Sequence, residues 1–181
     1  MYHKRLKGYA ELGYQVKFGA HNDHASAIYN GRTFAAAFEQ ELSNAARSVV
    51  IFSPYIQKGR VSKLLPALQE IVADGITVPV HTREVESYGP IHQPEIQETI
   101  LLIQQAGIQV ITHQELQQRY AIIDESIVWY GNVDFLAFGR KGAEVLRFVN
   151  ADVAGELLGL SQEKCEEQML LEETRRRPSP G

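Results

Sequence analysis

The alternation of helical and strand-like apolar patterns between residues 33 and 112 most limits the folds open to this chain. Apolar residues recur at helical spacing over residues 34–45, 61–73 and 94–106, and residues 48–53, 76–82 and 108–112 form short strand-like runs. Strands and helices that alternate in this way build α/β layers whose neighbouring strands run parallel. We therefore expect an α/β fold with a mixed, mostly parallel sheet flanked by helices.

Turn-forming and helix-capping residues mark the boundaries of these elements. Thr33 suits the N-cap of the first helix. Pro66 lies close enough to the start of the second helix to be tolerated there. Pro79 removes a backbone donor from the strand over residues 76–82, which predicts an edge strand or a bulge.

The last third of the chain has a different pattern, with short strands followed by a charged segment. Residues 119–130 predict a hairpin around Asp124, and residues 145–149 predict one more strand. Asn150 suits the N-cap of a short helix, after which residues 161–177 are highly charged and carry few apolar anchors.

Length and composition favour a single domain with extensions. At 181 residues and 44% hydrophobic content, the chain can bury one sizeable core but not two. We expect an N-terminal extension over residues 1–24, a domain over 25–160, and a charged helix and tail over 161–181. The net charge of -4 argues against a broadly basic nucleic-acid coat and allows only a local positive groove.

The location suggested by the sequence is the cytoplasm. Cys165 is the only cysteine and cannot form an internal disulfide, and the first residues lack the apolar run of a secretion signal. No apolar run approaches the roughly 20 residues needed to cross a bilayer, so we expect no membrane partner.

Residues 117–134 carry the most specific chemical pattern of the chain. They resemble the motif of the phospholipase D superfamily, His-x-Lys-(x)4-Asp followed by Gly-Ser-x-Asn. Asp124 and Gly131 match the pattern, whereas the histidine, lysine, serine and asparagine positions hold, in that order, Gln117, Arg119, Asn132 and Asp134.

The resemblance implies a site that has lost its nucleophile. The family's reaction proceeds through a covalent phosphohistidine, and the amide of Gln117 is neither a useful nucleophile nor a proton carrier. Losing positioned acid–base help alone costs roughly 100- to 10,000-fold in rate. Arg119 still offers a guanidinium to phosphate oxygens. We therefore expect phosphate binding to persist where hydrolysis has been lost.

Over about three-quarters of the chain, the order of features resembles the phospholipase D-like domains found attached to bacterial helicases and related nucleic-acid enzymes. This resemblance implies that Ser53, Arg83, Arg119 and Asn132 meet at one rim of the sheet as phosphate-binding residues. Glu144 lies roughly where family members place an acidic residue near the catalytic histidine. The chain holds one motif copy where the family's active site combines two, so the resemblance also implies a homodimer.

Several residues allow a structural as well as a functional interpretation. Asp124 favours a structural role, because an aspartate in a tight turn commonly accepts hydrogen bonds from backbone amides. His113 is the nearest imidazole to Gln117 and the candidate for a displaced nucleophile, although a solvated histidine is the simpler interpretation. Trp129 and Tyr130 could stack on bases or belong to the core.

Three functional hypotheses follow. The first is a dimeric, catalytically degenerate module that binds phosphate groups, DNA or RNA, as an accessory to a nucleic-acid enzyme such as a helicase. The second is a metal-independent endonuclease or phosphodiesterase that uses a displaced histidine, and the third is a purely structural dimerisation domain. We expect no cofactor and no metal, because the histidines and aspartate over residues 21–24 have no further spaced ligands.

Overall fold

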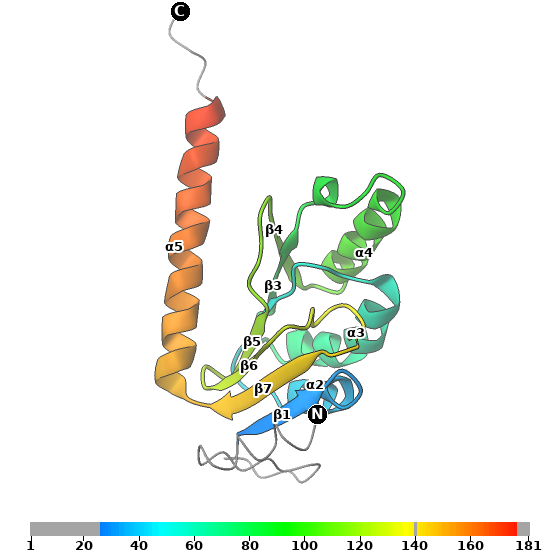
Figure 1. Ribbon diagram of the computed structural model, residues 1–181, viewed down its shortest axis with the longest axis vertical. Coiled ribbons are helices and arrows are strands. Elements are labelled where there is room, and N and C mark those ends of the chain that lie inside the picture. Colours follow the sequence, from blue (N-terminus) through cyan, green and yellow to red (C-terminus); the bar gives the residue numbers. More distant parts are fainter. Residues whose placement is uncertain (1–25, 140, 177–181) are drawn as a thin grey trace, which may run out of the picture.

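A seven-stranded sheet with helices on both faces forms the body of the protein (Figure 1). The structure is a computed structural model that describes residues 26–139 and 141–176. The strands lie in the order β1-β7-β6-β5-β2-β3-β4. In chain order they are β1 (Ala27–Asn30), β2 (Val49–Phe52), β3 (Pro79–Arg83), β4 (Gln109–His113), β5 (Tyr120–Ile123), β6 (Ile127–Gly131) and β7 (Glu144–Val149).

The mixed α/β class agrees with the sequence, but the prediction of a mostly parallel sheet is wrong. Only the pairs β2–β3 and β3–β4 are parallel. The pairs β1–β7, β7–β6, β6–β5 and β5–β2 are antiparallel. Crossover helices join parallel strands, whereas a short turn returns the chain in the opposite direction. The strand–helix alternation covers only β2 to β4, so it describes only that part of the sheet.

β3 lies inside the sheet between β2 and β4, which corrects the prediction of an edge strand. Pro79 is the first residue of β3, and the pairing of β2 with β3 begins one residue later, at Val80. The first residue of a strand is a position where a missing backbone donor is tolerated. The proline is therefore compatible with a central strand.

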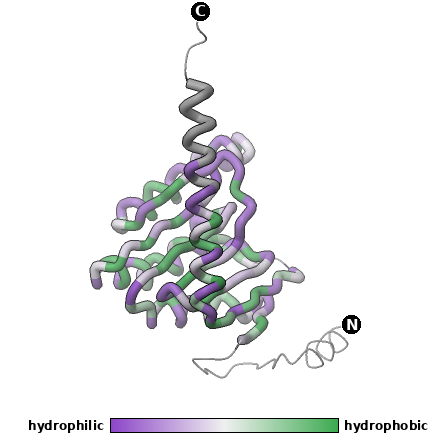
Figure 2. Tube along the Cα trace, turned by 90° about the vertical axis from the view of Figure 1, so that its left-hand side faces the viewer, coloured by the Kyte–Doolittle hydropathy of each residue, from purple (hydrophilic) through white to green (hydrophobic). Residues whose placement is uncertain are grey.

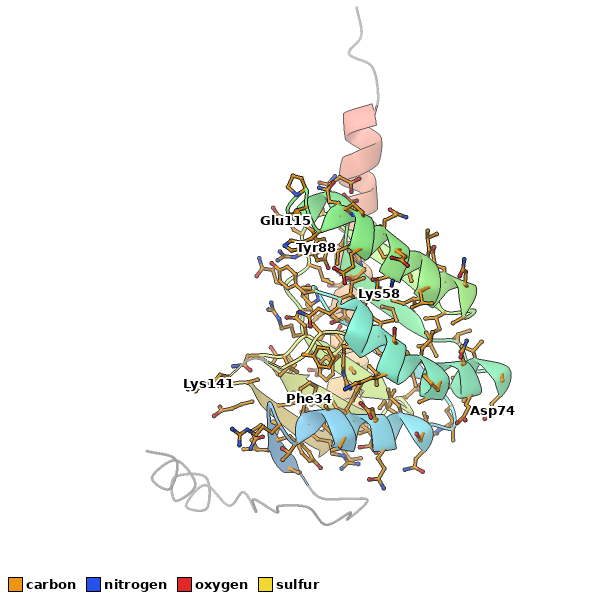
Figure 3. All side chains as sticks on the ribbon, turned by 90° about the vertical axis from the view of Figure 1, so that its right-hand side faces the viewer. Phe34, Lys58, Asp74, Tyr88, Glu115 and Lys141 are labelled. Carbon is orange, nitrogen blue, oxygen red and sulfur yellow. The ribbon has the colours of Figure 1, made fainter. Side chains whose placement is uncertain are left out.

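In the described part of the chain, three helices cover one face of the sheet and one covers the other. Figure 3 looks onto α2 (Phe34–Ser43), α3 (Lys58–Ala73) and α4 (Gln93–Gln105), which lie side by side. Figure 2 looks onto α5 (Ala151–Arg176), which crosses the opposite face and continues beyond the body. A 3-10 turn, η1 (Val85–Ser87), follows β3. No helix among the described residues is long and apolar enough to span a membrane.

Each face of the sheet buries its own apolar cluster, because successive strand residues point to opposite sides. The larger cluster lies under α2, α3 and α4 and includes Phe38, Leu64, Ile100 and Trp129. The smaller cluster lies under α5 and includes Phe52, Tyr120, Ile122, Val128 and Ala154. Among the described residues, α5 is the helix that packs over the second, smaller cluster.

Two helices are longer than the sequence predicts. α3 begins at Lys58, so Pro66 lies in the middle of the helix and not in its first turn. α5 runs unbroken for 26 residues, where the charged composition suggested a short helix and a separate charged segment. The capping prediction for Asn150 is confirmed, because its Oδ1 accepts the N–H of Val153 at 3.0 Å. Thr33 precedes α2 but makes no side-chain cap hydrogen bond.

Candidate functional site

The register of the sheet places the motif residues at one edge. Phe52 at the end of β2 pairs with Tyr120 at the start of β5, and Tyr120 pairs with Tyr130 near the end of β6. The residues just after β2, just before β5 and at the end of β6 therefore lie together. These are Ser53, Arg119 and Gly131–Asn132.

A hollow of about 410 Å³ opens at this edge, between the ends of β5 and β6 and helix α5. Its polar lining includes residues 117–119 and Asn132, and its apolar lining includes Tyr130, Leu157 and Leu160. Tyr120, Gly131 and Ser161 complete the lining. The volume lies within the range of about 300–1,000 Å³ that is usual for small-ligand sites.

Gln117 and Arg119 both face this hollow. Gln117 is exposed and lines the hollow, so its side-chain amide is accessible to a ligand there. The Arg119 side chain is 29% exposed, and its Nη1 donates a hydrogen bond of 3.4 Å to the backbone oxygen of Gln117. The Nη2 of Arg119 has no hydrogen-bond partner in the described part of the chain. An anion in the hollow could therefore bind the outer side of the guanidinium.

Asp134 occupies the inner side of the same guanidinium. Its Oδ1 accepts the Nε–H of Arg119 at 3.1 Å and the backbone N–H of Tyr55 at 3.2 Å. The motif pattern has an asparagine at this position. The carboxylate therefore compensates the charge of Arg119 within the protein, which an asparagine amide would not do.

Arg83 reaches the same edge but is held by protein groups. Its Nε donates to the backbone oxygen of Leu116 at 3.0 Å, and its Nη1 donates to the hydroxyl of Tyr55 at 2.7 Å. Its guanidinium carbon also lies 4.8 Å from the centre of the Tyr55 ring. Arg83 thereby anchors the segment that leads into Gln117, and it is not among the residues that line the hollow.

Ser53 lies beneath the edge and is completely buried. Its hydroxyl donates to the backbone oxygen of Tyr55 at 2.8 Å and accepts the backbone N–H of Leu136 at 3.0 Å. A ligand could reach this hydroxyl only if both bonds broke. The observed bonds give Ser53 a role in joining the loop after β2 to the loop after β6.

Asn132 lines the hollow but also closes the loop between β6 and β7. Its Oδ1 accepts the backbone N–H of Glu144 at 2.8 Å, and its backbone N–H donates to the backbone oxygen of Glu144 at 3.2 Å. A Cβ on Gly131 would collide with the same backbone oxygen, so only glycine allows this close approach. The side chain of Glu144 is exposed and has no imidazole at position 117 to orient.

Asp124 lies at the opposite end of β5 from Arg119. Its carboxylate accepts the backbone N–H groups of Ala46, Arg47 and Ser48 at 2.7–3.2 Å. The structural interpretation expected bonds to amides in the aspartate's own turn, but these amides belong to the segment before β2. Asp124 therefore ties the β5–β6 turn to a segment almost 80 residues away in the chain.

His113 is neither solvated nor exposed to the hollow. It is 7% exposed, and its Nε2 lies 2.9 Å from the Nδ1 of His81 in a buried hydrogen bond. His81 stacks on Phe52, with ring centres 4.0 Å apart. Burial, and to a lesser degree the neighbouring His113, lower the pKa of His81 to about 4. The solvated interpretation of His113 is thus wrong, and a nucleophilic role gains no support from its position.

No group of three or more metal-ligating side chains occurs within residues 26–139 and 141–176. The histidines at positions 21 and 24, from which we expect no metal site, lie outside the described residues.

Similarity to known proteins is evident in the fold. No protein-family model matches the sequence, and no curated protein matches it. Among solved structures, NucT from Helicobacter pylori matches with a TM-score of 0.59 and 18% identity, over 78% of this chain and 95% of NucT. Nuc from Salmonella typhimurium, a phospholipase D family member, matches with a TM-score of 0.57 and 17% identity, over 78% of this chain and 92% of Nuc.

This protein has a phospholipase D-like fold. A third match, the archaeal chromatin protein TrmBL2, has a TM-score of 0.56 and 10% identity, over 91% of this chain and 59% of TrmBL2. Its structure is described as showing a novel mode of DNA binding. At these identities the likeness concerns the fold, and the chemistry of this phospholipase D-like domain depends on its own residues.

The motif did not predict the apolar residues that line the hollow. Leu157 and Leu160 belong to α5, which carries no motif, and their place beside Gln117 depends on how that helix packs. The sequence could have predicted that Tyr130 and Trp129 point to different faces of the sheet, because neighbouring strand residues alternate between the two faces. In the structure Trp129 is 1% exposed and Tyr130 is 52% exposed.

Proposed function

We propose that this protein is a phosphate-binding module on a phospholipase D-like scaffold, that nucleic acid is its ligand, and that it does not cleave that ligand. One observation carries the proposal: Gln117 and Arg119 line the same hollow, and the Nη2 of Arg119 is unpaired among the described residues. In the proposed motif alignment, Gln117 stands at the position of the nucleophile. The hollow thus offers a cation for a phosphate and an amide where an attack on phosphorus would begin.

The burial of His113 supports the binding module over the alternative of a displaced nucleophile. The His113 ring is hydrogen-bonded to His81, which stacks on Phe52. His113 does not line the hollow. A nucleophile must reach the phosphorus atom it attacks. The endonuclease hypothesis would therefore require His113 to leave a buried hydrogen bond first.

We further propose that two copies associate so that two hollows form one binding groove, and that the dimer acts as an accessory to a nucleic-acid enzyme such as a helicase. The single motif copy in this chain supports the dimer. Sedimentation equilibrium should then give about twice the mass of the chain. A monomer at all concentrations would rule out the shared groove and leave a single-copy site.

Binding of a labelled oligonucleotide against salt concentration tests the proposal. Arg119→Ala should weaken binding roughly tenfold or more, because charge-assisted hydrogen bonds to phosphate are strong, and should reduce the salt slope by about one phosphate contact. Arg47→Ala is the matched control, because Arg47 is exposed at the far end of β5, beside Asp124. Equal losses in both variants would contradict a role for the hollow in binding.

A further inference from the structure

We propose that the hollow binds one nucleotide unit of a single strand, with the phosphate on Arg119 and the base against Tyr130 and Leu160. This inference rests on the proposed function and specifies its ligand. The motif residues explain only the phosphate half of such a unit. The apolar side of the hollow supplies the other half.

Tyr130 presents its ring to the ligand side of the sheet. Trp129 belongs to the core cluster under α2 to α4, so the next residue of the strand points to the face of α5. Tyr130 lines the hollow and is 52% exposed. An exposed aromatic ring in a cavity is a stacking platform that accepts any base, because every base has a π-face.

Helix α5 provides further apolar lining of the hollow. Leu160 is 55% exposed and lines the hollow together with Leu157. The helix is fixed there by Tyr120, whose hydroxyl donates to the backbone oxygen of Leu157 at 3.1 Å and also bonds Ser161. Because Tyr120 is 2% exposed, its ring supports the wall and is not itself a stacking surface.

The polar and apolar sides together match a nucleotide better than a phosphate alone. A phosphate would use Arg119 and leave Tyr130 and Leu160 in water, whereas a flat base would cover their apolar surface. Gln117 and Gln118 offer amides that donate and accept hydrogen bonds at base edges. Since bases in a duplex are already paired and stacked, the arrangement selects single strands.

Three probes separate the base from the phosphate: a single-stranded oligonucleotide, the same strand with abasic sites, and the matching duplex. Their affinities are measured by fluorescence anisotropy at one salt concentration. The wild-type protein should bind the normal strand more tightly than either of the others. Tyr130→Ala should weaken binding of the normal strand roughly 5- to 100-fold, the usual range for one stacked base, and should leave the abasic strand unchanged.

Two further variants keep the test specific. Tyr130→Phe retains the ring and should bind like the wild type. Phe138→Ala is the matched control, because Phe138 is 49% exposed but lies against Gly59 and Lys63 of α3. The Phe138→Ala substitution removes an exposed ring of similar size outside the hollow. This variant should bind the strand like the wild type.

The outcomes distinguish this inference from the proposed function. If Arg119→Ala weakens all probes while Tyr130→Ala matches Phe138→Ala, the base contact is wrong and the phosphate site stands. If Arg119→Ala changes nothing, both fail. If Tyr130→Ala turns a dimer into a monomer in sedimentation, a second copy covers the ring and the base contact is overturned.

Discussion

The Nε of Arg119 donates to Oδ1 of Asp134 at 3.1 Å, which pairs a cation that lines the hollow with a carboxylate of the loop after β6. The charge of Arg119 is partly neutralised by Asp134, whose side chain is only 12% exposed. Asp134 also accepts the backbone N–H of Tyr55, so the carboxylate is fixed in place beside the hollow. A bound phosphate must therefore share Arg119 with a resident carboxylate.

Replacing Asp134 by asparagine should strengthen binding of phosphate-bearing ligands. The amide of the Asp134→Asn variant would keep an oxygen for Arg119 and for Tyr55 but remove the negative charge that repels phosphate. We expect a gain of at least about threefold in oligonucleotide affinity at low salt, which shrinks as salt screens the charges. Asp152→Asn is the matched control, because Asp152 is an exposed acid in the first turn of α5, at the other end of β7. Unchanged affinity in Asp134→Asn would show that the carboxylate does not compete.

Asp124 should matter for stability and not for binding. Asp124→Ala leaves three backbone N–H groups of residues 46–48 without their acceptor, which should lower the free energy of unfolding by about 1–3 kcal/mol in urea denaturation. The Asp124→Asn variant keeps one acceptor oxygen and should lose less stability than Asp124→Ala. Glu125→Ala is the control, because Glu125 is exposed and shares the positive φ of the same turn. A loss of ligand affinity in Asp124→Ala without a loss of stability would contradict this role.

The buried pair His81–His113 should make the fold sensitive to acid. The pKa of His81 falls from its ordinary value of 6.5 to about 4 in the folded protein, mainly because of burial. Between these values the unfolded chain binds more protons than the folded chain, so stability is full above pH 6.5 and falls as the pH drops toward 4. This pKa shift corresponds to a loss of about 3 kcal/mol at most in the free energy of unfolding.

Urea denaturation between about pH 7.5 and 4.5 measures this dependence. His81→Gln keeps a hydrogen-bonding group beside His113 but cannot titrate, so its stability should vary less with pH than that of the wild type. His92→Gln should retain the full slope, because His92 is exposed. Parallel curves for the wild type and His81→Gln would assign the acid sensitivity to other groups.

Substitutions of Arg60 and of Glu39 should change the free energy of unfolding by different amounts. Arg60 is 1% exposed, pairs with Glu39 across α2 and α3, and has no partner for its Nε and Nη2 among the described residues. Glu39→Ala leaves a buried charge unpaired and should cost about 1–3 kcal/mol in thermal or urea unfolding. Arg60→Met fills similar volume without charge and should change stability by less than about 1 kcal/mol. A larger loss from Arg60→Met would mean that the ion pair itself stabilises the fold.

Local patterns predicted most elements but not how they are arranged. Helical spacing and capping residues located α2, α3 and α4, and apolar runs located β2 to β7 to within a few residues, because these signals depend on neighbours along the chain. β1 carries too short a signal, and the unbroken α5 contradicted a composition that suggested a short helix. The antiparallel majority of the sheet depends largely on pairs between strands far apart in the chain, β1 with β7 and β2 with β5, which local patterns do not encode.

The sequence by itself determined which groups the site contains: an amide at position 117, a guanidinium at 119 and a carboxylate at 134 are fixed by residue identity and motif spacing. Only the tertiary structure decided what those groups meet. It joined Arg119 to Asp134, buried His113 against His81, and placed Tyr130 and Leu160 in the same hollow as Gln117 and Arg119. Such contacts depend on strand order, register and helix packing, which bring together residues that are far apart in the chain and leave no mark on their immediate neighbours.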